Sequence, residues 1–104
     1  MAKIKDSVVI EFGKLAKKRF SPCKVILFGS RAKNMQSADS DYDFLLISPQ
    51  FKKWEWEERS AKAYRLKRNI PAAMDILCLT PDEFTKKRHQ IGVVLEAVKD
   101  GIVI

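Results

Sequence analysis

The sequence predicts an α/β (α+β) domain in which helices pack against a small mixed β-sheet. Three short apolar runs, at residues 23–28, 41–47 and 73–79, are typical of buried strands. Two longer segments, 3–19 and 54–69, repeat their apolar residues at the spacing of an amphipathic helix. The 104 residues are 46% hydrophobic and 32% charged, with four Gly and four Pro. This composition excludes a disordered chain, and its length predicts a single hydrophobic core.

The composition also bears on localisation. No apolar run approaches the roughly 20 residues of a membrane-spanning helix. Asp6 and Glu11 interrupt the N-terminal segment, where a secretory signal would need an unbroken apolar stretch. Cys23 and Cys78 fit no metal-binding or disulfide pattern and are interpreted as small buried hydrophobic residues. We therefore expect one domain over residues 1–104, in the cytoplasm and without a membrane partner.

The N-terminal half is predicted to form a helix, a strand, a loop and a second strand. The helix covers 3–19 and ends before Ser21-Pro22. The strand at 23–28 is followed by a polar loop at 34–40 and the strand at 41–47. The apolar positions of the helix are Ile4, Val8, Phe12 and Leu15.

The C-terminal half is predicted to form a helix, a strand, a helix and an edge strand. The helix at 54–69 ends before Pro71, and the third strand follows at 73–79. Thr80 is a suitable cap for the last helix, because a proline and two acids come next. An edge strand at 102–104 closes the domain. The apolar stripe of the last helix consists of Ile91, Val94, Leu95 and Val98.

Three acids occupy positions where an apolar strand has no structural use for them. Asp41 and Asp43 are two residues apart on a predicted strand, so their side chains are expected on the same face of the sheet. Asp75 interrupts the apolar run of the third strand. Three carboxylates on neighbouring strands would form an oxygen-rich site suited to Mg²⁺. The alternative is that Asp41 and Asp43 are solvated at the strand end and that Asp75 pairs with an arginine.

A Gly-Ser turn follows the first strand. Gly29 ends the buried run, and Ser30 and Arg31 could begin a helical turn. Backbone N–H groups at such a junction, with a serine hydroxyl beside them, can bind a phosphate. The simpler interpretation is a turn glycine, and neither a G-x-x-x-x-G-K-[ST] nor a G-x-G-x-x-G motif occurs.

The positive charge is unevenly distributed. The net charge is +7, and residues 1–33 hold nine Lys and Arg against two acids. This excess indicates an anionic partner, which could be nucleic acid, a nucleotide or an acidic protein surface. The alternative is a solvated helix face.

Two segments, taken together, resemble the signature of the polymerase-beta-type nucleotidyltransferase superfamily. They are Phe28–Lys33, with its Gly-Ser, and Ser40–Leu46, with its Asp-x-Asp, and Asp75 supplies the third acid on a later strand. The chain is similar over essentially its whole length to the minimal nucleotidyltransferases, which include antitoxins paired with HEPN-domain toxins. It departs from the family loop at Asn34, where a glycine is common.

The resemblance implies a polymerase-beta-like fold and a role for each residue of the signature. Gly29 and Ser30 would hold the β- and γ-phosphates of a nucleoside triphosphate. Asp41 and Asp43 would hold two Mg²⁺ ions, and Asp75 would complete the metal site and help to deprotonate the attacking hydroxyl. The cationic residues expected to assist the triphosphate are Arg31 and Lys33.

The function implied is Mg²⁺-dependent transfer of a nucleoside monophosphate, AMP from ATP, to a hydroxyl of a partner macromolecule, with a HEPN toxin protein as that partner. One alternative is a non-catalytic module that binds and neutralises a partner protein, with Trp54 and Trp56 as contact residues. A second is a nucleic-acid-binding domain that uses the basic N-terminal third. The sequence leaves open whether the protein forms an oligomer.

Overall fold

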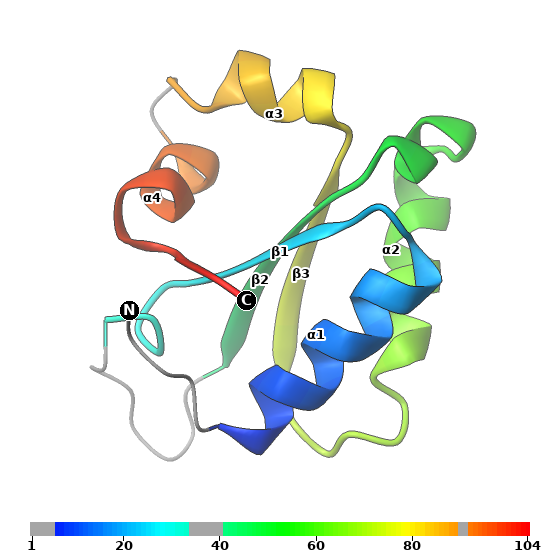
Figure 1. The fold of residues 1–104 in the computed structure, drawn as a ribbon, viewed down its shortest axis with the longest axis vertical. Coiled ribbons are helices and arrows are strands. Elements are labelled where there is room, and N and C mark those ends of the chain that lie inside the picture. Colours follow the sequence, from blue (N-terminus) through cyan, green and yellow to red (C-terminus); the bar gives the residue numbers. More distant parts are fainter. Residues whose placement is uncertain (1–5, 34–40, 90–91) are drawn as a thin grey trace.

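A four-stranded mixed β-sheet with strand order β3-β2-β1-β4 forms the centre of the fold (Figure 1). Strand β1 pairs antiparallel with both β2 and β4, whereas β2 and β3 are parallel. The predicted mixed sheet is thus confirmed. The strands are β1 (Lys24–Phe28), β2 (Tyr42–Ile47), β3 (Met74–Leu79) and β4 (Ile102–Val103).

The structure is a computed structural model. Three predictions lie outside the residues it describes: Ile4 at the start of the first helix, the polar loop at 34–40, and Ile91 in the C-terminal stripe. The described residues are 6–33, 41–89 and 92–104.

Two pairs of helices cover the two faces of the sheet (Figure 1). Helices α1 and α2 pack on one face, and α3 and α4 pack on the other. No helix in the described part of the chain is both long and apolar enough to span a membrane. The helices are α1 (Ser7–Arg19), α2 (Trp56–Leu66), α3 (Pro81–Lys87) and α4 (Val93–Asp100), and a 3₁₀ helix, η1 (Pro49–Lys53), precedes α2.

Strand side chains alternate between two hydrophobic clusters, one under each pair of helices. Tyr42, Phe44 and Leu46 of β2 face α1 and α2, where they join Phe12 and Phe20 in the larger cluster. The smaller cluster lies under α3 and α4, and its members are Ile26, Phe28, Leu45, Ile47, Leu79, Val94 and Ala97. The near-continuous apolar runs in the sequence reflect this burial on both faces.

Three element boundaries differ from the predictions. Helix α1 begins at Ser7 because the Asp6 side chain accepts hydrogen bonds from the N–H groups of Val8 and Val9. The helix predicted over 54–69 is shorter, because the backbone of Trp54 and Glu55 is extended between the 3₁₀ helix and α2. The single helix predicted after Thr80 is two helices, because Gly92, at φ 140°, has a backbone conformation incompatible with a continuous helix.

Candidate functional site

The Gly-Ser turn and two of the three predicted acids come together at one edge of the sheet. Parallel strands β2 and β3 both begin there, and antiparallel β1 ends there. Phe28 of β1 therefore lies opposite Asp43 of β2, and Asp43 in turn lies opposite Asp75 of β3. A row across three strands thus joins Gly29, Asp43 and Asp75, which are far apart in the sequence.

The carboxylates occupy the face of the sheet covered by α3 and α4. Asp43 alternates with Tyr42 and Phe44, which face the opposite helices. Asp75 alternates with Met74 and Ile76 in the same way. The carboxylates of Asp43 and Asp75 are therefore on the same face of the sheet.

Asp43 is surrounded by other carboxylates. Partial burial raises its pKa above the ordinary aspartate value, and the negative charges of Asp75, Asp41 and Glu96 raise it further. A hydrogen bond between the side chains of Asp43 and Asp75 acts in the same direction. Asp41 lies just before the first residue of β2 and is exposed. The environment of Asp43 therefore favours a proton or a bound cation.

Gly29 allows the turn after β1 to approach the Asp43 carboxyl group closely. Its φ of 76° is a conformation that favours glycine. A Cβ atom at this position would overlap Oδ2 of Asp43. The Gly29 carbonyl accepts hydrogen bonds from the N–H groups of Ala32 and Lys33, at 3.2 and 3.3 Å, which close the turn. Ser30 lies within this turn and is half-buried.

The two predicted cationic residues, Arg31 and Lys33, contact acids outside the row. The Arg31 guanidinium lies 3.8 Å from the centroid of the Tyr42 ring and 3.9 Å from Oδ2 of Asp6. The Lys33 ammonium lies 3.8 Å from Glu96 and 3.5 Å from Asp100, both on α4. The turn is thus tied to α1 through Arg31 and to α4 through Lys33.

A pocket of about 530 Å³ opens beside Asp43 and Asp75. This volume lies within the ~300–1,000 Å³ range of small-molecule sites. Its walls include the aromatic rings of Trp56 and Tyr64 from α2, and Lys87 from the end of α3. Sequence reasoning missed Tyr64 and Lys87, because their helices reach the pocket only through the tertiary packing.

Tyr64 also fixes the edge of the sheet next to Asp75. Its hydroxyl accepts a hydrogen bond, 3.1 Å long, from the backbone N–H of Ile76. Strand β3 is an edge strand of the sheet, so this N–H group would otherwise need water or another partner. Tyr64 thereby helps to hold the Asp75 segment of β3 in place.

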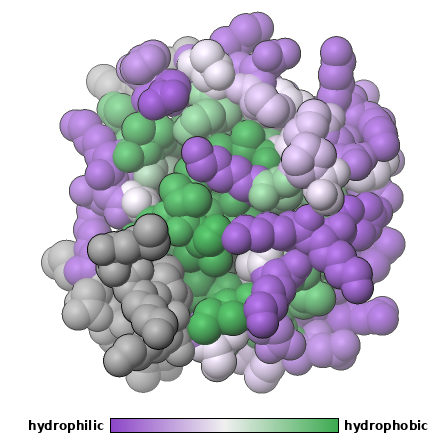
Figure 2. Space-filling view, in the orientation of Figure 1, coloured by the Kyte–Doolittle hydropathy of each residue, from purple (hydrophilic) through white to green (hydrophobic). Residues whose placement is uncertain are grey.

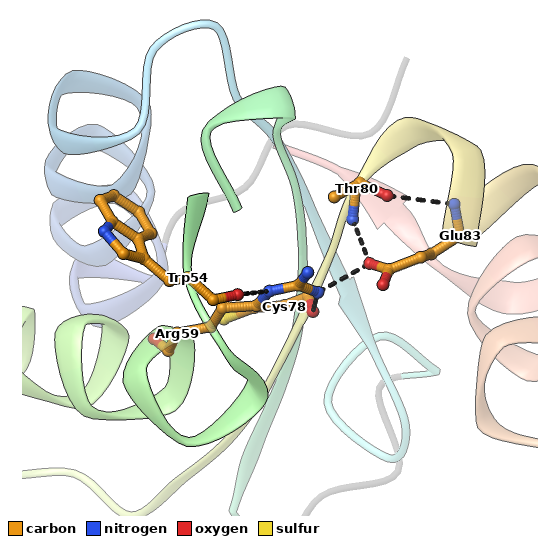
Figure 3. A network of polar contacts seen from close by, with 5 residues as sticks. All are labelled: Trp54, Arg59, Cys78, Thr80 and Glu83. Carbon is orange, nitrogen blue, oxygen red and sulfur yellow. Dashed lines mark hydrogen bonds and ion pairs between the residues drawn. The ribbon is translucent and has the colours of Figure 1, made fainter. Parts of the chain in front are cut away.

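A buried arginine joins α2 and α3, two of the helices that line this pocket (Figure 3). Arg59 of α2 is 8% exposed. Its Nε donates to the Trp54 carbonyl at 3.1 Å, and its Nη1 lies 2.7 Å from Oε1 of Glu83 on α3. Nη1 also lies 3.5 Å from the Cys78 carbonyl of β3. Because Glu83 and Thr80 form a capping box, this network fixes the start of α3 against α2 and β3.

The acids of the row have the chemistry of a Mg²⁺ site, since that ion prefers carboxylate and phosphate oxygens. The mutual repulsion at Asp43 is what such an ion would relieve. Among the described residues, no group of three or more His, Cys, Asp or Glu side chains is arranged as a metal-binding cluster. Asp43 and Asp75 therefore fit the ion, and a complete site would need Asp41 or substrate oxygens as further ligands.

Comparisons with known proteins agree with this geometry. The chain matches the nucleotidyltransferase domain family over residues 9–101. The fold resembles a 1.40 Å crystal structure from Sulfolobus solfataricus, assigned as a nucleotidyltransferase, with a TM-score of 0.55 and 19% identity over 99% of this chain and 90% of that one. A second crystal structure with the same assignment has a TM-score of 0.57 and 19% identity over 80% of this chain and 89% of that one. No curated protein matches the sequence.

The family match places the fold in the nucleotidyl-transferring class. The protein belongs to the nucleotidyltransferase domain family, which matches nearly the whole chain. It is accordingly a transferase, and its family implies a nucleoside triphosphate as substrate.

Proposed function

We propose that this protein transfers AMP from ATP, in the presence of Mg²⁺, to a hydroxyl group of a partner macromolecule. The observation that carries the proposal is the row that places Gly29 beside Asp43, and Asp43 opposite Asp75. Family membership supports nucleotidyl transfer in general. The adenine base and the acceptor go beyond that general statement and are part of the proposal.

Each residue of the row has a separate task in the reaction. The Gly29-Ser30 turn would hold the β- and γ-phosphates, and Asp41, Asp43 and Asp75 would hold two Mg²⁺ ions. When bound, these ions neutralise charge on the attacking and leaving oxygens. The acceptor oxygen forms a bond to the α-phosphorus, the bond to the β-phosphate oxygen breaks, and pyrophosphate leaves. Asp75 accepts the proton of the attacking hydroxyl.

In the proposed reaction, Arg31 and Lys33 support the turn that would bind the phosphates. Both residues hold the phosphate-binding turn through contacts with Asp6, Glu96 and Asp100. Either cation could assist the triphosphate after exchanging a carboxylate partner for a phosphate, because both charge pairs are partly exposed.

The acceptor in the proposal is a tyrosine hydroxyl of a HEPN-domain protein, and the protein acts as its antitoxin in the cytoplasm. The resemblance of the signature to antitoxin nucleotidyltransferases supports this choice. The aromatic walls of the pocket beside Asp75 also suit a planar phenol or nucleobase. Specificity for the acceptor would then be provided by the docking of the partner.

The experiment combines the protein, α-labelled ATP, Mg²⁺ and a HEPN-domain protein, and measures the label on each chain. The Asp43→Asn/Asp75→Asn variant is expected to lose transfer, whereas Asp82→Asn, which changes an exposed acid at the start of α3, should retain it. Equal labelling by the wild type and the double variant would show that the row is not the catalytic site. Labelling from GTP or CTP instead of ATP would overturn the choice of base.

The same variant tests the alternative function, a non-catalytic neutralising module. That alternative is favoured by the exposure of Trp56, which leaves 47% of an aromatic residue accessible to a partner. If Asp43→Asn/Asp75→Asn still neutralises the partner fully, binding is sufficient and catalysis is not the antitoxic activity.

A further inference from the structure

A second groove lies between α1 and α2, on the opposite side of the sheet from the carboxylates. Its volume is about 390 Å³. We call it the basic groove, and the residues that line it are Glu11, Leu15, Arg19, Lys62, Arg65, Leu66, Arg68, Asn69 and Ile70. In Figure 2, hydrophilic side chains gather over the side of the molecule where α1 and α2 lie.

The charges of the basic groove are unbalanced. Four cationic side chains line it, against the single carboxylate of Glu11. Within the part of the chain that the structure describes, none of these four cations forms a salt bridge. By contrast, Arg31, Lys33 and Arg59 each have a carboxylate partner. An external anion would supply the missing negative charge. The four cations are Arg19, Lys62, Arg65 and Arg68.

Two of the cations are held by one aromatic ring. The Lys62 ammonium lies 4.7 Å from the centroid of the Trp54 ring, and the Arg19 guanidinium lies 5.5 Å from it. Trp54 in turn packs against Phe20 and Phe51 of the larger hydrophobic cluster. Cations from two different helices are thereby positioned together, which reduces the entropy lost when both bind one ligand.

The lining of the groove favours a phosphate backbone over a protein surface. Three of its four cations are arginines, whose planar guanidinium groups match phosphate oxygens in a bidentate geometry. Arginine also anchors protein interfaces, but there it occurs together with exposed aromatic residues such as Trp and Tyr. Among the described residues, none of the large exposed hydrophobic side chains lines the groove: Ile10, Trp56, Tyr64, Val93, Val98 and Val103.

We propose that the basic groove binds the phosphate backbone of a nucleic acid. The groove and the carboxylate row lie on opposite faces of the sheet, so one protein molecule can bind a ligand at each site at the same time. The proposal does not depend on the proposed transfer reaction, and the Asp43→Asn/Asp75→Asn variant is expected to bind the nucleic acid as the wild type does.

The test is fluorescence anisotropy with labelled single-stranded RNA and DNA of about 12 nucleotides, within the usual site size of strand-binding proteins. If all four cations contact phosphates, the logarithm of the affinity should fall against the logarithm of salt concentration with a slope of up to about −3. Arg65→Glu/Arg68→Glu should weaken binding at least about tenfold and reduce that slope by about 1.4.

The matched control is Lys52→Glu/Lys86→Glu, which makes the same change of net charge at exposed positions outside the groove. Binding by this control should stay within about threefold of the wild type, because exposed charges far from a contact are screened by salt. Circular dichroism of both variants establishes that they are folded.

Three results would overturn the proposal. The first is no binding by the wild type at low salt. The second is an equal loss of affinity in Arg65→Glu/Arg68→Glu and in the control. The third is displacement of the labelled strand by an acidic polyglutamate peptide that binds the wild type but not Arg65→Glu/Arg68→Glu. The last result would identify the ligand as an acidic protein.

Discussion

Replacing Gly29 by alanine tests whether the close approach of the turn to Asp43 builds the site. At φ 76°, a residue with a Cβ atom loses about 1–2 kcal/mol relative to glycine. The new Cβ would also overlap Oδ2 of Asp43, so the carboxyl group has to move. We therefore expect Gly29→Ala to lower the free energy of unfolding by at least about 1–2 kcal/mol and to displace the central carboxylate of the row.

The control is Gly13→Ala, in the middle of α1. Alanine is favoured over glycine in a helix interior by about 0.5–1 kcal/mol. A Cβ at Gly13 would lie 2.9 Å from Cγ2 of Ile104, so that side chain has to shift, and the cost of the shift opposes the gain in helix propensity. The control is expected to stay within about 1 kcal/mol of the wild type.

Urea unfolding followed by circular dichroism gives both free energies, and isothermal titration with Mg²⁺ and a non-hydrolysable ATP analogue measures the site. Gly29→Ala should bind the analogue at least about tenfold more weakly, which corresponds to a loss of about 1.4 kcal/mol of binding free energy. Gly13→Ala should bind it as the wild type does. If Gly29→Ala matched the wild type in stability and in affinity, the packing of Gly29 on Asp43 would have no part in the site.

Three further variants test the electrostatics and the walls of the pocket. Because the pKa of Asp43 is raised in the folded state, the wild type loses stability as pH rises above the ordinary aspartate pKa. In urea titrations, Asp43→Asn should therefore be more stable than the wild type at pH 7 and equally stable near pH 3. Arg59→Met removes the arginine partner of Glu83 and the side-chain donor to the Trp54 carbonyl, and should cost about 2–3 kcal/mol by thermal unfolding. A change below about 0.5 kcal/mol would show that the network is dispensable. Burial acts to raise the pKa of Glu83, but hydrogen bonds from Arg59 and Thr80 lower it overall. The wild type should therefore lose stability as pH falls through that lowered value, and Glu83→Gln should show a flatter acid limb.

The acids of the row could be singled out from the sequence because local patterns mark them. Alternation within a strand places Asp43 on one face, and a lone acid in an apolar run marks Asp75. The parallel pairing of their strands, with the register that places the two residues opposite each other, was not predicted, because a mixed sheet allows several strand orders and registers. The same local patterns located all four strands to within one residue at each end.

The surroundings of the row could not be predicted, because they depend on contacts between distant segments. Arg31 and Lys33 lie next to the turn in sequence, but their acidic partners come from the start of α1 and from α4. Tyr64 reaches the pocket only because α2 lies beside the edge strand β3. The division between α3 and α4 at Gly92 was missed because the apolar stripe of the last helix hides the break.

The repulsion at Asp43 distinguishes this acid, to which we assign a function, from a structural acid such as Glu83. A structural carboxylate, like Glu83, has hydrogen-bond donors that lower its pKa, and its replacement by an amide should weaken the fold. Partial burial and then carboxylate neighbours raise the pKa of Asp43, so Asn in its place should strengthen the apoprotein. Mg²⁺ should reverse this order by stabilising the wild type and not Asp43→Asn, since an ion that binds only the folded state adds to its stability. If Mg²⁺ shifted both proteins equally, the acids of the row would not be its ligands, and the repulsion would need another explanation.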